Sequence, residues 1–192
     1  MYITFERNIM NHAIHHEKIH IGTRGIKTAI TAAICTLLYL IFDRNPTFAC
    51  IGVVFGTGSD LGNSWLNGGN RLFGTIFGGL IGMGLFSLYL CVHPDGGFHP
   101  LMILLVFIGV ILLILVSLVF HWPGAVQPGG VMLCILLFNQ PAASYIPYSL
   151  NRIFDTAVGV ALALLVSYLL PKERIHNIST KLAVALHKAK NN

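Results

Sequence analysis

The run LMILLVFIGVILLILVSLVF, residues 101–120, contains a single polar side chain, Ser117. An α-helix rises about 1.5 Å per residue, so a helix of this length crosses about 30 Å, the thickness of the hydrocarbon core of a bilayer. Strands of a membrane barrel would instead alternate apolar and polar residues. The run therefore predicts a transmembrane helix, and an all-α, polytopic membrane protein as the fold class.

The composition of the whole chain agrees with this prediction. Of 192 residues, 55% are hydrophobic and 10% are charged, and the mean hydropathy is +0.73, whereas soluble domains carry about 25% charged residues. The 12 Lys+Arg exceed the 7 Asp+Glu, but they lie mostly in the two tails and form no basic stripe. This distribution excludes a nucleic-acid-binding module, so no nucleic acid is expected among the partners.

Six membrane spans are expected. Four apolar runs are long enough to cross the bilayer on their own, namely 26–42, 72–92, 101–120 and 153–170. Two further runs, 48–58 and 122–138, are short or interrupted by Gly and Pro, and they cross only if neighbouring polar residues also enter the membrane. No removable signal peptide is visible in the first 20 residues, so insertion is expected to depend on the internal spans.

The distribution of basic residues predicts the orientation. With six spans and both termini inside, ten of the 12 Lys+Arg fall on the inner side, and only Arg44 and Arg152 fall outside. The chain is then organised as a cytoplasmic tail (1–22), a six-helix membrane domain (23–171) and a short amphipathic cytoplasmic tail (172–192) in a bacterial cell membrane.

A short internal repeat divides the membrane domain. Asn70-Arg71-Leu72-Phe73-Gly74-Thr75 returns 81 residues later as Asn151-Arg152-Ile153-Phe154-Asp155-Thr156, with four identities in six positions. Halves of three spans each, about 23–93 and 100–171, must lie in the membrane with opposite orientation. The two irregular runs then correspond to each other, and such a pair is typical of a binding site near the bilayer midplane.

Three motifs together resemble a known family. GTRGIKTA spans residues 22–29, RxxGTxxGxxxG begins at Arg71, and RxxDTxxG begins at Arg152, with Pro171 after it. Their order and spacing resemble the aromatic acid exporter family, the group of fusaric acid resistance protein-like (FUSC-like) membrane proteins, over roughly residues 20–172. The resemblance implies a six-helix inner-membrane unit, export of aromatic or other organic carboxylic acids, and pairing of two such units.

Two arginines and one carboxylate are the main chemical candidates. Arg71 and Arg152 begin their expected spans, either as interfacial anchors or as symmetry-related sites that bind a carboxylate. Asp155 lies one turn after Arg152, either as its intrahelical ion partner or as a carboxylate that carries a proton across the membrane. The full set of proposed substrate-binding residues is Arg71, Arg152, Thr75, Thr156, Lys27 and Trp122, with Asp155 for proton coupling.

Several other residues have plainer interpretations. Gly74, Gly78 and Gly82 form a helix-packing face, within one protomer or between protomers. Lys27 and Arg24 share a helix face that fixes the inner end of the first span, and Asp60 is expected in a loop before the third span. Four aromatic residues fit interfacial belts, although Trp122 and Phe138 are also placed to contact an aromatic ligand; the four are Trp65, Trp122, Tyr145 and Tyr148.

Metal, disulfide and enzymatic chemistry are not indicated. His12, His16 and His20 share a helix face, but without acidic or thiol ligands nearby a polar or pH-responsive surface is favoured over a metal site. The four cysteines lack CxxC spacing, so no disulfide or zinc site is expected. The sequence has no HExxH, GxSxG or P-loop, so it predicts no enzyme, no catalytic residue and no cofactor.

The expected function is export of small organic anions by proton-coupled alternating access, in a homodimer or larger oligomer embedded in the lipid bilayer. Aromatic carboxylates are the substrate class that the resemblance implies. One alternative is a membrane scaffold that transports nothing and binds a partner through its glycine-rich helix faces. Another is a passive anion channel.

Overall fold

The computed structural model describes residues 23–94 and 96–170, and all regular secondary structure in these ranges is helical. The elements are α2 (Thr23–Ile41), α3 (Thr47–Gly56), α4 (Leu61–Val92), α5 (Leu101–Val119), a 3₁₀ turn η1 (Pro123–Ala125), α6 (Val126–Asn139) and α7 (Tyr145–Leu169). This arrangement confirms the predicted all-α fold class.

Among the described helices, α2, α4, α5 and α7 are long and apolar enough to cross a membrane. The two remaining apolar segments, α3 and the η1–α6 segment, are shorter. Four long and two short helices lie where the four apolar runs and the two interrupted runs were expected. It stays a prediction that the short helices also cross the bilayer as parts of two inverted halves.

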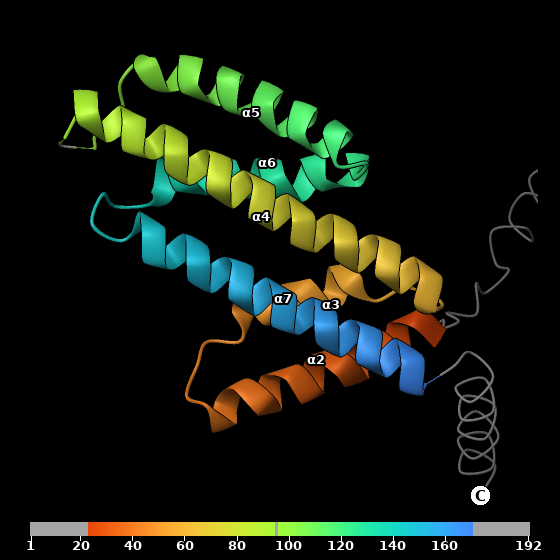
Figure 1. Ribbon diagram of the computed structural model, residues 1–192. Coiled ribbons are helices and arrows are strands. Elements are labelled where there is room, and N and C mark those ends of the chain that lie inside the picture. The colour runs from red at the N-terminus through yellow and green to blue at the C-terminus, as the bar shows by residue number, and fades with distance from the viewer. Residues whose placement is uncertain (1–22, 95, 171–192) are drawn as a thin grey trace, which may run out of the picture.

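Helices α4 and α7 lie side by side at the centre of the bundle (Figure 1). They are antiparallel, because the hydroxyls of Ser64, near the start of α4, and Ser167, near the end of α7, hydrogen-bond at 2.8 Å. Helix α5 flanks α4, and α2 flanks α7. Each short helix packs chiefly against the central helix from the other half of the chain: α3 lies on α7, and α6 lies on α4.

Glycines set the distance between the short and the central helices. A Cβ atom added at Gly78 of α4 would overlap the backbone of Gly129 in α6, and one at Gly159 of α7 would overlap the carbonyl group of Ala49 in α3. Only glycine permits this approach of two backbones. The structure places the glycine face of α4 (Gly74, Gly78 and Gly82) against η1 and α6, inside the protomer.

Both central helices begin earlier than the sequence indicated. The polar stretch before Arg71 was expected outside the third span, but α4 already begins at Leu61. Asp60 itself lies outside the helix, as expected, and its side chain accepts a hydrogen bond from the Asn63 N–H at 2.8 Å, which caps the helix. Ser64 and Gly68 then face α7. The stretch is helical because its small side chains pack against another helix.

The longer helices move the two arginines away from the helix ends. Arg71 is ten residues after the first residue of α4, and Arg152 is seven residues after the first residue of α7. Both helices therefore begin before these arginines, and that the membrane-crossing parts begin at Arg71 and Arg152 stays a prediction. At about 1.5 Å per residue, they lie roughly 15 Å and 10 Å along their helices. Both are buried inside the protein. The two interpretations, interfacial anchors or carboxylate-binding sites, both stay predictions.

Some predictions fall on residues 1–22 and 171–192, which lie outside the described residues. These are the histidines His12, His15, His16 and His20, and the amphipathic C-terminal tail. The four cysteines are all described and are free thiols. Cys35 is buried in the cluster that joins α2 to α3, whereas Cys91 is exposed.

Substituting Gly78 tests the close contact between α4 and α6. Gly78→Ala is expected to lower the free energy of unfolding by about 1–3 kcal/mol, because the new methyl group meets backbone that cannot rotate away. Gly84→Ala is the matched control on the same helix, since a Cβ there meets nothing within 4 Å. The control should leave stability unchanged or raise it by about 0.5–1 kcal/mol through helix propensity. Thermal unfolding in detergent measures both, and equal effects would contradict this packing.

Candidate anion site and the polar clusters around it

Arg71 is a buried cation whose environment is incomplete. The residue is 9% exposed, and its Nε atom is buried without a hydrogen-bond partner among the described residues. Its guanidinium carbon lies 5.3 Å from the ring centroid of Phe55, at the end of α3. Burying a charge is costly unless that charge is paired or hydrogen-bonded. The incomplete environment therefore points to an anionic partner.

A cavity of about 370 Å³ lies beside Arg71. Three amide side chains line it, together with the Phe55 ring, and the complete lining is Phe55, Asn67, Asn70, Arg71, Gly124, Gln127, Pro128 and Val131. The volume is within the range of small-molecule sites, about 300–1,000 Å³. Guanidinium and amide N–H groups donate hydrogen bonds to a carboxylate, and a phenyl face accepts an apolar body. The cavity thus has the chemistry to bind a small organic anion.

Arg152 lies in a separate environment. It is 4% exposed, its Nη1 donates to the Tyr148 hydroxyl at 2.8 Å, and its guanidinium carbon stands 4.0 Å above the ring centroid of Phe48. Helix α3 thus presents Phe48, near its start, to Arg152 and Phe55, near its end, to Arg71. The two arginines, related by the sequence repeat, both stack on aromatic rings of one short helix.

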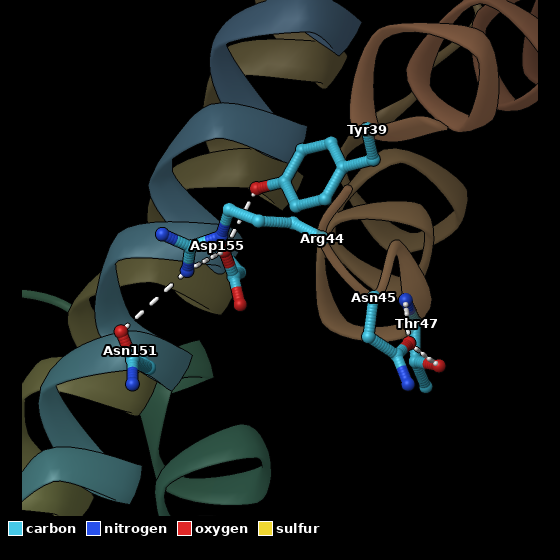
Figure 2. A network of polar contacts seen from close by, with 6 residues as sticks. All are labelled: Tyr39, Arg44, Asn45, Thr47, Asn151 and Asp155. Carbon is cyan, nitrogen blue, oxygen red and sulfur yellow. Dashed lines mark hydrogen bonds and ion pairs between the residues drawn. The ribbon is translucent and has the colours of Figure 1, made fainter. Parts of the chain in front are cut away.

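Asp155 does not pair with Arg152, so that interpretation is wrong. Its Oδ1 atom accepts hydrogen bonds from Arg44 Nη2 at 3.0 Å and from the Tyr39 hydroxyl at 2.8 Å (Figure 2). The Arg152 guanidinium instead contacts the aromatic rings of Phe48 and Tyr148. The cluster joins α7 to the end of α2 and to the loop after it. Sequence spacing within one helix gave no sign of these contacts.

Lys27 and Arg24 bind backbone carbonyl groups at the end of α3. Arg24 Nε donates to the Thr57 carbonyl at 3.0 Å, and Lys27 Nζ donates to the Ser59 carbonyl at 3.4 Å. The last carbonyls of a helix lack intrahelical partners and carry partial negative charge, so cations are favoured there. Lys27 is fully buried and does not line the Arg71 cavity.

The remaining predicted residues do not line the cavity. Thr75 Oγ1 donates to the Arg71 carbonyl at 2.8 Å, and Thr156 is buried with its hydroxyl unpartnered among the described residues. Trp122 lies over Gly69 and packs 4.8 Å from the Phe73 ring. Of the six proposed substrate-binding residues, Arg71 is the one that lines the cavity.

The sequence interpretation missed most of the cavity lining. Asn67 and Asn70 fell in the stretch expected outside the third span, and Gln127 and Phe55 were not singled out. One signal was present: Asn67, Asn70 and Arg71 lie within one turn of a helix that is otherwise rich in glycine and apolar residues. Recognising it required the earlier start of α4.

Comparison with known proteins assigns the chain to a protein family. A family model described as "Fusaric acid resistance protein-like" matches residues 22–166. The chain belongs to this family. The match confirms the resemblance carried by the three motifs, and it places the protein in a family of membrane transport proteins rather than enzymes. For this fusaric acid resistance protein-like chain, no curated protein and no solved structure gives a significant match.

A double-mutant cycle tests the cluster at Asp155. Arg44→Gln is expected to lower the free energy of unfolding by about 1 kcal/mol, because it leaves a largely buried carboxylate with one partner fewer while Arg44 itself is partly solvated. Adding Asp155→Asn should recover part of that loss, since both charges are then absent. Reversible unfolding in mixed micelles measures the cycle, and strictly additive effects would contradict the pairing.

Proposed function

We propose that this protein exports small organic anions, with aromatic carboxylates as the substrate class, across the cell membrane by proton-coupled alternating access. The observation that carries the proposal is Arg71, which is buried, has no partner for its Nε within residues 23–94 and 96–170, and lines a cavity of suitable size. The family suggests a transporter-like function without specifying a substrate. The cavity chemistry supports an anion with an apolar or aromatic body.

Different lining residues would bind different parts of the ligand. Arg71 supplies a fork of N–H donors that matches the two oxygens of a carboxylate. Asn67, Asn70 and Gln127 supply further donors and acceptors, which replace water around the anion as it leaves solution. The exposed Phe55 ring offers its face to the apolar part of the ligand.

Alternating access is proposed to use two inverted halves of three spans each. The exchanged packing of the short helices supports this, because α3 lies on α7 and α6 lies on α4. Gly78 and Gly159, separated by the repeat spacing of 81 residues, each meet the backbone of the short helix of the other half. Small shifts at these two contacts would move the halves relative to each other. Arg152, Thr75, Thr156, Lys27 and Trp122 are proposed to assist the anion during this movement.

The proposed topology has both termini in the cytoplasm. Arg71 and Arg24 then lie toward the inner side, because both contact the end of α3 that adjoins the start of α2. Arg44, after the end of α2, lies toward the outer side. Pairing of two such units in the membrane is part of the proposal, and much apolar side-chain surface on α2 and α5 is available to lipid or to a second copy.

Efflux from proteoliposomes tests the anion site. Vesicles are loaded with labelled benzoate, and release is measured with and without an imposed pH gradient. Arg71→Ala is expected to reduce saturable release at least tenfold, because a hydrogen bond to a charged group is worth about 1.5–3 kcal/mol. Asn70→Ala should reduce release less, and Asn63→Ala, a matched control on the same helix outside the cavity, should leave it unchanged.

The same assay separates the competing functions. Release that does not saturate would favour a passive channel. No release of benzoate or of any related carboxylate from folded wild-type protein would overturn the transport proposal and favour a membrane scaffold. A stoichiometric co-purifying protein would then be expected.

Asp155 is proposed to couple flux to protons. It is the carboxylate held inside α7, and protonation would remove its ion pair with Arg44. Asp155→Asn is expected to abolish stimulation of benzoate release by a pH gradient and to spare release down a benzoate gradient. Stimulation that persists in the folded variant would exclude Asp155 as the coupling group.

A further inference from the structure

A second cavity, of about 320 Å³, lies beside Arg44 between the end of α2 and α7. Its lining combines a cation and a phenol with aromatic and aliphatic side chains: Leu38, Tyr39, Phe42, Arg44, Phe154 and Val158. It shares no lining residue with the cavity at Arg71. A guanidinium at the edge of an apolar space is again a place for a small anion with an apolar body.

Backbone geometry holds Arg44 in place. Asp43 adopts a left-handed conformation (φ 49°), and the N–H of Arg44 donates to the Tyr39 carbonyl at 3.0 Å, which closes the end of α2 in a Schellman-type turn. On the other side, the Asn45 side chain accepts the Thr47 N–H at 3.0 Å where α3 begins (Figure 2). The position of the Arg44 backbone is therefore set by the loop, independently of its ion pair.

The guanidinium of Arg44 is only partly used. Within the described residues, Nη2 is its one donating nitrogen, toward Asp155 Oδ1 at 3.0 Å and Asn151 Oδ1 at 3.5 Å. The guanidinium carbon lies 5.3 Å from the Phe154 ring centroid, and the Arg44 side chain is 42% exposed, compared with 8% for Asp155. Nε and Nη1 remain available to an incoming carboxylate.

We propose that the Arg44 cavity is a second binding site for a small organic carboxylate, and that Asp155 is an internal carboxylate that competes with this ligand for Arg44. The inference deepens the proposed function, because the ligand is the transported anion, but binding at Arg44 is measurable without transport. Arg44 is a binding residue that the sequence interpretation assigned only to an outer loop.

The competition makes anion binding at this site depend on protons. Ionised Asp155 holds both Arg44 and the Tyr39 hydroxyl. When Asp155 takes up a proton from water, its carboxylate becomes a neutral acid, and Arg44 keeps its charge and turns to the ligand. Ionisation of Asp155 then displaces the ligand. The groups that face or neighbour Asp155 are Arg44 from the loop, Tyr39 and Cys35 from α2, and Asn151 and Arg152 on α7.

The position of this site along α3 supports a role in the anion path. Arg71 stacks near the end of α3, Arg152 stacks near its start, and Arg44 precedes it in the adjoining loop. Two guanidiniums thus stack on one short helix of ten residues, and Arg44 lies in the loop before that helix, with its guanidinium on α7. An anion that leaves Arg71, near the end of α3, would meet Arg152 and then Arg44 toward the start of α3, and Arg44 is the last of the three toward the predicted outer side.

Equilibrium binding tests the inference. Labelled benzoate is dialysed against the purified full chain in detergent, with Arg71→Gln as the parent so that the first cavity does not contribute. Adding Asp155→Asn is expected to raise benzoate affinity at pH 7 about tenfold, which corresponds to about 1.4 kcal/mol. Adding Arg44→Gln as well should remove the gain.

Asp43→Asn is the matched control for the change in charge. Asp43 is the exposed carboxylate next to Arg44 in the chain, and asparagine tolerates its left-handed backbone. A gain in Asp155→Asn no greater than the gain in Asp43→Asn would overturn the competition. So would a gain that survives Arg44→Gln, because the ligand would then be bound elsewhere.

A second measurement needs no substitution at Asp155. Benzoate added to the Arg71→Gln parent in weakly buffered solution, at a series of pH values from acid to neutral, should cause net proton uptake in part of that series, followed with an indicator dye, and Arg44→Gln should abolish it. Binding without proton uptake would contradict the inference even if Asp155→Asn fails to fold. These outcomes are independent of the efflux assay, since Arg71-dependent efflux with no site at Arg44 would leave the proposed function standing.

Discussion

Backbone contact between each short helix and a central helix is the constraint on which the rest of the structure depends. Gly159 lets α3 approach α7 at Ala49, and Gly78 lets α6 approach α4 at Gly129. Side chains larger than hydrogen at either glycine would overlap backbone atoms. In a bilayer, helices gain little hydrophobic energy from meeting each other, so close packing and polar contacts must hold them together. The glycines permit the close packing.

The polar side chains follow from this packing. Because α3 lies against α7 and extends beside α4, its two phenylalanines reach Arg152 and Arg71. Because α2 returns into α3 through a tight turn, Arg44 reaches Asp155. Guanidiniums are expensive in an apolar environment, and each of these three, two buried and Arg44 partly exposed, has an aromatic face within about 6 Å, the range of a cation–π contact. The structure therefore tolerates the charges that an anion transporter needs.

The two cavities differ in whether the arginine that lines each of them already has a carboxylate partner. At Arg71 the Nε has no partner among the described residues, so the site is prepared for an external ligand. At Arg44, Nη2 already donates to Asp155, and an incoming carboxylate would compete with this internal one for the charge of Arg44. In the proposed function, one membrane domain would offer an anion an open site near the end of α3 and a site with an internal competitor near its start. If the protein transports anions as proposed, this difference would supply a physical basis for direction and for proton dependence.

Apolar run length and the order of three motifs by themselves determined that this protein is helical, membrane-embedded and a member of the fusaric acid resistance protein-like family. The internal repeat also singled out Arg71 and Arg152, and Asp155 stood out as a carboxylate inside an apolar run. Tertiary structure alone decided the true starts of α4 and α7, the Arg44–Asp155 pair and the amide lining of the Arg71 cavity. The physical reason is that polar stretches become helical, and charges find partners, through contacts between segments far apart in the chain, which hydropathy and local spacing do not record.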